Sequence, residues 1–195
     1  MIALLLFVGG ILLDVPPVVT ECICSKAKVH DGWCDPCKIG YVAGLKISSK
    51  LLFTTIDHGH EIPSDTRCET CKKAIPVDEF CNACQVGYYQ RKIYYSSFTH
   101  CLVKGVRVNR EQVSCAACLR NMEEGGWCDV CKRGIFGNVS VMQQAHFDQA
   151  VASFRRLKLG LAHLDQCELC GIAMYSNGMC PKCEIIYKNG KPTTE

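Results

Sequence analysis

Four cysteine clusters at nearly constant spacing constrain this chain more than any other feature of its sequence. Each cluster holds two cysteine pairs, with nine residues between the inner cysteines. The third cysteines, at positions 34, 81, 128 and 180, lie 47, 47 and 52 residues apart. A period of this length indicates one supersecondary unit used four times. The clusters span residues 22–37, 68–84, 115–131 and 167–183.

The composition explains why such a unit needs its cysteines. The chain has 17 cysteines among 195 residues, a share that is typical of scaffolds held by cross-links or metal ions. A repeat of about 47 residues usually cannot stay folded by apolar burial alone. We therefore expect the cysteines to hold each unit together.

Two further features recur in front of the third cysteine. A turn-forming residue pair lies there, and the residue directly before the cysteine is large and apolar, so we expect that residue in the core of the unit. The turn pairs are Asp31-Gly32, Gly125-Gly126 and Asn177-Gly178, and the second cluster has Asp78-Glu79, a weaker version. The apolar residues are Trp33, Phe80, Trp127 and Met179.

Behind each cluster the sequence predicts a β-hairpin. The sixth and seventh residues after the last cysteine form a pair that β-branched, apolar or aromatic residues precede in all four units and follow in the first three. Asn-Gly and similar pairs favour the two-residue turn of a hairpin. The pairs are Ala43-Gly44, Gln90-Arg91, Gly137-Asn138 and Asn189-Gly190.

A helix is predicted after each of the first three hairpins. Ser48-Ser49 and Ser96-Ser97 are N-cap candidates for the first two, and the apolar spacing predicts the third over about residues 142–163. The fourth unit ends in a polar tail. The predicted fold class is a small, metal-stapled α+β chain of four tandem units, each with two cysteine turns and a hairpin.

The repeats divide the chain into an N-terminal segment and four units. Residues 2–13 are apolar, which is shorter than the roughly twenty residues that span a bilayer but suits the apolar part of a secretory signal. We expect residues 1–20 to be an export signal or short anchor, so that the protein is exported or membrane-anchored. The alternative is a buried strand in a cytoplasmic protein. The predicted units are 21–60, 61–106, 107–163 and 164–195.

The cysteine pattern resembles the short zinc-ribbon family. Two C-x-x-C turns, here called knuckles, can face one point and form a tetrahedral cage of four sulfurs, the usual structural zinc arrangement. The stretch "CETCKKAIPVDEFCNAC", residues 68–84, is similar in character to members of that family. The chain also resembles bacterial proteins of unassigned function that carry such units in tandem. The resemblance covers the four clusters and not the hairpin and helix segments between them.

By this resemblance each cluster would hold one zinc ion, about three to four ions per chain. The first unit departs from the family pattern, because Cys22-Ile23-Cys24 replaces the first C-x-x-C, and His30 is an alternative ligand there. The implied ligands are Cys22, Cys24, Cys34 and Cys37; Cys68, Cys71, Cys81 and Cys84; Cys115, Cys118, Cys128 and Cys131; and Cys167, Cys170, Cys180 and Cys183.

Other cysteine chemistries stay open at this point. A four-thiolate cage can also hold mononuclear iron, and disulfides gain weight if the chain is exported. Covalent haem requires C-x-x-C-H, and no pair is followed by histidine. A thioredoxin-like redox role is disfavoured, because no βαβ pattern surrounds any pair.

Three residues outside the clusters are further candidates. Cys101 is predicted to be a buried core thiol, with a reactive thiol as the alternative. His58 and His60 follow a predicted helix end, where Gly59 suits a C-cap and histidine interacts favourably with the helix dipole. A second metal site is the alternative for these histidines.

The sequence contains no convincing catalytic constellation, and we expect a non-enzymatic protein. The formal net charge is +3, and a zinc ion bound by four thiolates carries −2, so four loaded sites would give about −5 overall. A net negative charge makes nucleic-acid binding less favoured, and it stays an alternative hypothesis. The leading hypothesis is an interaction or assembly scaffold with protein partners. Storage or sensing of a soft metal is the other alternative.

Overall fold

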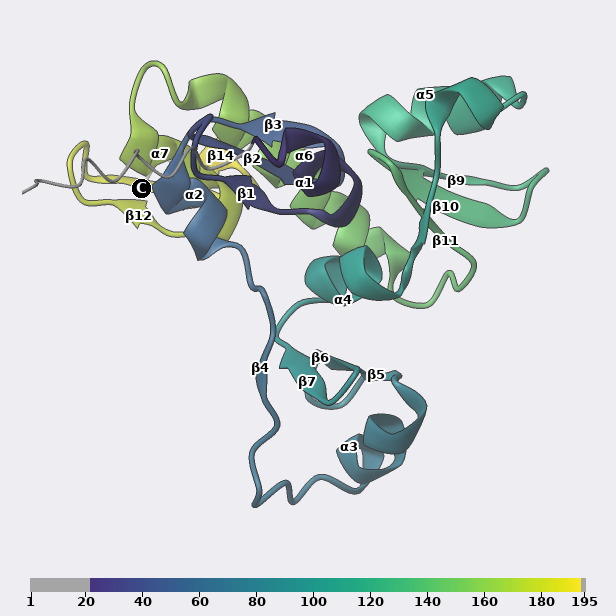
Figure 1. Cartoon of the computed structure of the whole chain (residues 1–195). Helices are drawn as coiled ribbons and strands as arrows, with labels where there is room; N and C mark the ends of the chain where they lie inside the picture. The colour runs from purple at the N-terminus through teal and green to yellow at the C-terminus, as the bar shows by residue number, and fades with distance from the viewer. Residues whose placement is uncertain (1–21, 194–195) are drawn as a thin grey trace, which may run out of the picture.

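The computed structural model describes residues 22–193 (Figure 1). The predicted export signal or anchor at residues 1–20 lies outside the described residues. Among those described, no helix is both long enough and apolar enough to cross a membrane. Four small antiparallel sheets follow one another along the chain, with helices beside them, so the fold is a mixed α and β arrangement as expected.

Each unit opens with a short helix that contains the second cysteine of its cluster. The predicted first knuckle is therefore wrong, because the first cysteine pair lies at a helix start in the second, third and fourth units, and in the first unit Cys24 begins the helix two residues after Cys22. In three units the first cysteine is the N-cap residue, with extended backbone. The helices are α1 (Cys24–His30), α3 (Glu69–Ala74), α5 (Ala116–Glu124) and α7 (Glu168–Ser176).

The predicted turn pairs end these helices. The first residue of each pair is the C-cap and has a positive φ, 54° at Asp31 and 72° at Gly125. In the second unit the short 3-10 helix η1 (Ile75–Val77) continues α3 before the cap at Asp78. Asn177 caps α7 in the left-handed conformation, which asparagine tolerates better than most residues.

A short strand then carries the third cysteine into the sheet. It pairs antiparallel with the first strand of the hairpin, and the second cysteine pair forms a turn between the two strands. This turn is the predicted second knuckle. The strands are β1 (Trp33–Cys34), β5 (Phe80–Cys81), β9 (Gly126–Cys128) and β12 (Met179–Cys180).

All four predicted hairpins are present, each with the predicted two-residue turn. Both turn residues have positive φ in the first, second and fourth hairpins, the geometry that matches the twist of paired strands. The strand pairs are β2 (Ile39–Val42) with β3 (Leu45–Ile47), β6 (Val86–Tyr89) with β7 (Lys92–Tyr94), β10 (Arg133–Phe136) with β11 (Val139–Val141), and β13 (Ile185–Lys188) with β14 (Lys191–Pro192).

The predicted helices follow the first three hairpins. Ser49 caps α2 (Lys50–Thr55), where its hydroxyl accepts a hydrogen bond from the Leu52 N–H at 2.9 Å. Ser96 caps α4 (Ser97–Lys104) in the same way through Thr99. The third helix, α6 (Phe147–His163), begins five residues later than predicted.

Three further elements join the units. Strand β4 (His60–Glu61) pairs with β7, and β8 (Val106–Arg107) pairs with β11, so each extends the hairpin of the unit that follows it. The short 3-10 helix η2 (Arg110–Gln112) then leads to the third cluster. These strands lie at the predicted boundaries 60/61 and 106/107.

In each of the first three units, the helix that follows the hairpin packs closely against it. A glycine of the hairpin lies under an aromatic ring at the start of that helix or within it. Gly40 lies under Phe53, and a Cβ at Gly40 would be 2.6 Å from the Phe53 ring, too close for a real side chain. The same 13-residue offset recurs as Gly87 under His100 and as Gly134 under Phe147. The close approach explains the glycine in the middle of each strand.

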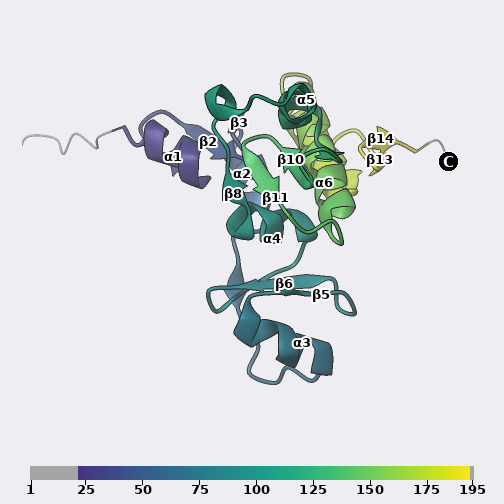
Figure 2. The same ribbon diagram turned by 90° about the vertical axis from the view of Figure 1, so that its right-hand side faces the viewer.

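The largest core is shared among units. Helix α6 packs its buried face, which includes Phe147, Phe154 and Leu157, against buried residues of the first hairpin, α2, α4 and the third hairpin. The second unit has a small core of its own around Tyr88. In both views its α3 end projects from the rest of the molecule beyond α4 (Figures 1 and 2).

Candidate metal centres

The sixteen predicted ligand cysteines meet in four groups of four. Within each group the four sulfur atoms lie within 4.8 Å of one another. Two sulfurs come from the start of the opening helix, and two come from the knuckle that follows. Each group could therefore hold one metal ion. The groups are Cys22, Cys24, Cys34 and Cys37; Cys68, Cys71, Cys81 and Cys84; Cys115, Cys118, Cys128 and Cys131; and Cys167, Cys170, Cys180 and Cys183.

The sulfur separations fit a tetrahedron around one ion. A zinc–sulfur bond of about 2.3 Å gives a tetrahedral edge of about 3.8 Å. The first and third sulfurs are 3.9 Å apart in the second unit, 3.8 Å in the third and 3.9 Å in the fourth. A disulfide bond would be about 2.05 Å long, and all the cysteines are free thiols. Such a four-sulfur set suits zinc or iron.

The helix start explains why the first cysteine becomes a ready ligand. In the second unit the backbone N–H of Cys71 faces the Cys68 sulfur and lowers the pKa of Cys68 to about 6. The N–H of Cys118 lowers the pKa of Cys115 to about 6 in the third unit. Backbone N–H groups at a helix start favour negative charge. The thiolate form, which binds metal, is thus favoured before any ion arrives.

The first unit departs from the others in structure as well as in sequence. Helix α1 has Ile23 as its N-cap, so neither cysteine of the first pair has the cap position. Hydrogen bonding with Cys22 raises the pKa of Cys24. The Cys22 and Cys37 sulfurs are exposed and 3.2 Å apart. Cys22 and Cys24 nevertheless both reach the group, and His30 is not part of it.

The polar side chain beside the cysteines differs between units, and the sequence predictions did not include it. In three units a tyrosine lies there, and burial and the neighbouring sulfurs raise the pKa of its hydroxyl: Tyr41 near Cys24, Tyr88 near Cys71 and Tyr187 near Cys170. Each tyrosine is the seventh residue after the third cysteine. Aligning the four copies on that cysteine would have revealed it.

The third unit has a cation in place of this neutral hydroxyl. Ile135 occupies the tyrosine position, and the guanidinium of Arg133 lies beside Cys131 and Cys118, whose sulfurs raise the Arg133 pKa. The Nε atom of Arg133 is buried and has no hydrogen-bond partner within the described residues. The third site therefore has a positive charge beside its thiolates, where the other three have a phenol.

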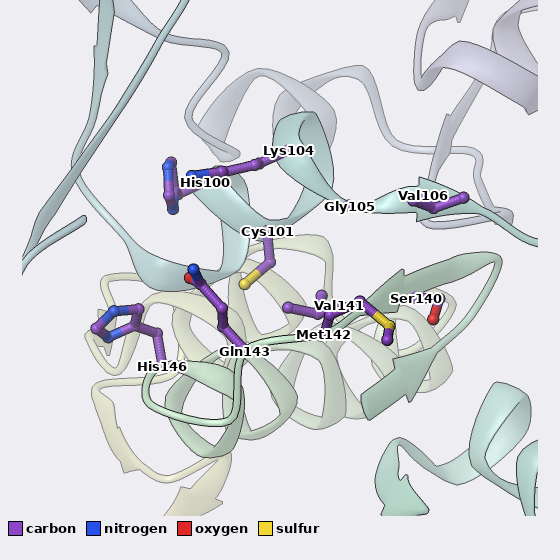
Figure 3. Close-up of a pocket in the computed structure, with 10 residues that line it drawn as sticks. All are labelled: His100, Cys101, Lys104, Gly105, Val106, Ser140, Val141, Met142, Gln143 and His146. Atoms are coloured by element: carbon purple, nitrogen blue, oxygen red, sulfur yellow. The ribbon is translucent and has the colours of Figure 1, made fainter. Parts of the chain in front are cut away.

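The remaining candidates lie outside the four groups. The Cys101 thiol is buried, as expected, and burial raises its pKa to about 12. It faces a pocket of about 190 Å³ between α4 and the segment that leads into α6, with His100, Lys104 and His146 around it (Figure 3). Neither His58 nor His60 belongs to a metal group in the described chain.

The two histidines have structural contacts instead. Helix α2 ends at Thr55 with Ile56 as its C-cap, so the expected cap at Gly59 is wrong. The His58 Nε2 atom still lies 3.0 Å from the Phe53 carbonyl oxygen in the last turn of that helix. His60 lies on β4, 3.2 Å from a carboxylate oxygen of Asp57. These contacts fit the helix-end interpretation for His58.

Comparisons with protein-family models, with curated protein sequences and with solved structures found no match to this chain. The resemblance to zinc ribbons therefore depends on the cysteine groups themselves. What these groups show is four places where one metal ion fits, repeated in one chain.

Proposed function

We propose that this protein is a non-enzymatic scaffold that binds protein partners and is held together by four structural zinc ions. The observation that carries the proposal is the set of four groups of four cysteines, each with its sulfurs within 4.8 Å of one another. Each group ties an opening helix to its hairpin, and the cores that remain around three of them are small. Units of this size usually need a metal ion or another cross-link to fold.

The closed ligand sets support a structural role. Four protein sulfurs complete the coordination of zinc, whereas catalytic zinc sites keep one position open for water or substrate. Each loaded site would have a net charge of −2 before its hydrogen-bond donors are counted. Binding surfaces would then lie on the hairpins and helices between the sites, where apolar side chains such as Val106 and Met142 are each 66% exposed.

Metal content and thiol count test the proposal together. The purified protein should contain about four zinc ions per chain and, once denatured with a chelator, should titrate all of its thiols. Cys71→Ser should lose one ion, whereas Cys101→Ser, outside the groups, should keep all of them. A protein with no metal and paired cysteines would contradict the proposal.

Soft-metal handling is the second candidate, and the first unit favours it. Its exposed Cys22 and its missing N-cap cysteine distinguish it from the other three. We expect a weak competing chelator to empty this site first. If the protein keeps its fold after that loss, the first site suits a buffering or sensing role, and the other three remain structural.

A further inference from the structure

Within residues 22–193, no helix covers the face of the fourth hairpin that is equivalent to the covered face of the other three. In the first three units that face lies under α2, α4 or α6. In the fourth, β13 pairs Ile186 with Met179, and both side chains are exposed, 41% and 58%. The sequence predicted Met179 as core, and that prediction is wrong, because no helix among the described residues covers it.

Ile186 changes the shape of this face. Aligned on the third cysteine, it occupies the position of Gly40, Gly87 and Gly134, the glycines that admit an aromatic ring from the covering helix. An isoleucine there fills the hollow that the glycines leave. A helix seated on this face would therefore need a small residue, such as alanine, where the other helices have phenylalanine or histidine.

The charge of this face favours one kind of binding partner over another. Residues two apart on a strand share a face, so Lys188 lies on the side of Ile186, and Lys191 pairs with Lys188 across the hairpin. Both lysines are exposed. In the third unit the equivalent residues are Phe136 and Val139, which are buried. Like charges disfavour the pairing of two copies through this face, whereas carboxylates on a partner would complement it.

We propose that this face, formed by Met179, Ile186, Lys188 and Lys191, docks an acidic amphipathic helix of a partner protein, with a small residue over Ile186. The inference rests on the proposed scaffold function and names one of its binding surfaces. The three internal helices supply the geometry, since each lies over an equivalent sheet in this chain (Figures 1 and 2).

A synthetic helix derived from α6 tests the proposal. The probe has the sequence of α6 with alanine at the place of Phe147 and glutamate at the places of Phe154, Arg155 and Lys158, and an outer-face staple holds it helical. In α6 the Phe154 ring lies 5.4 Å from that of Phe136, the equivalent of Lys188. A glutamate at the place of Phe154 should therefore lie near Lys188 and Lys191 when the probe is bound. Fluorescence anisotropy of the labelled probe is followed with full-length protein of measured zinc content.

The matched variants lie side by side on one strand. Ile186→Ser should weaken probe binding by about tenfold or more, because an isoleucine contact is lost. Ile185→Ser, on the opposite face, should change it by less than about twofold. A probe with lysine in the three glutamate places should bind at least about tenfold more weakly.

Several results would overturn the proposal. They are a protein with full zinc content that does not bind the probe, equal binding of the lysine probe, and equal effects of the two serine variants. A protein dimer that Ile186→Ser dissociates would also overturn it, by assigning the face to a second copy. Loss of zinc would instead count against the proposed function, so the two failures are distinguishable.

Discussion

At the scale of single residues, the third metal group differs from the other three in the charge beside it. Tyr41, Tyr88 and Tyr187 place a neutral hydroxyl near the sulfurs, whereas Arg133 places a charged guanidinium there. A cation offsets part of the −2 charge of a loaded four-thiolate site. We therefore expect the third site to keep its metal longest.

Replacing the charged donor should remove this advantage. Arg133→Gln should weaken metal binding at the third site by about 10- to 100-fold, the usual effect of losing a partner of a metal ligand. Native mass spectrometry with competing chelator, together with mapping of the alkylated cysteines, reports which site empties. Arg120→Gln, at an exposed position of α5, is the control. Unchanged retention in Arg133→Gln would mean that the guanidinium does not matter to the metal.

His100 is a buried histidine whose ionisation should affect stability. It occupies the position of Phe53 and Phe147, is 4% exposed, and burial lowers its pKa below the usual 6.5. The unfolded chain then binds the proton more tightly, so stability should fall as the pH falls through about 6.5. His100→Phe should show a smaller loss of stability between about pH 7.5 and 6 in denaturant unfolding. Zinc content is checked at both values, and an unchanged pH dependence would contradict the assignment.

At the scale of elements, local turn chemistry was predictable and the first knuckle was not. Two-residue turns and serine caps depend on residues a few positions apart, and all four hairpins and both caps were predicted. A C-x-x-C pair suits either a knuckle or a helix start, so the sequence could not choose between them. The sixteen grouped cysteines were predicted, but Arg133 was not, because its role appears only when Ile135 is seen in place of a tyrosine.

The glycine beneath each covering helix gives a prediction at this scale. Gly134→Ala would place a methyl group against the Phe147 ring, and overpacking of this kind costs about 1–3 kcal/mol of unfolding free energy. Gly32→Ala is the control, since its Cβ would lie 3.4 Å from the nearest Ala27 atom without a positive φ. Denaturant unfolding of the zinc-loaded protein measures both. Equal stabilities of the two variants would show that the helix can shift to admit the methyl group.

At the scale of the whole molecule, contacts distant in sequence join the units. Helices α6 and α7 cross where Gly160 meets Gly171, and Ser49 donates to a carboxylate oxygen of Glu168 at 2.6 Å. The first and third hairpin turns also meet, where the Asn138 N–H donates to the Ala43 carbonyl at 3.0 Å. The repeat pattern does not predict these pairings, because it describes contacts within one unit, and each of these contacts joins residues of two different units.

The ion pair between Asp31 and Arg107 should contribute measurably to the free energy of unfolding, because it connects two units. Asp31 caps α1, and Arg107 on β8 approaches it through two N–H···O contacts of 2.6 and 3.2 Å. The carboxylate is 13% exposed. A double-mutant cycle with Asp31→Ala and Arg107→Ala should therefore give a coupling of about 1–3 kcal/mol.

The Arg110–Glu123 pair is the control for this cycle. It has a contact of 2.7 Å but is more than half exposed, so its cycle should give less than about 1 kcal/mol. Both cycles use unfolding free energies of the zinc-loaded protein. Equal couplings would mean that the pair does not bind the first unit to the third, and that the shared core around α6 does so alone.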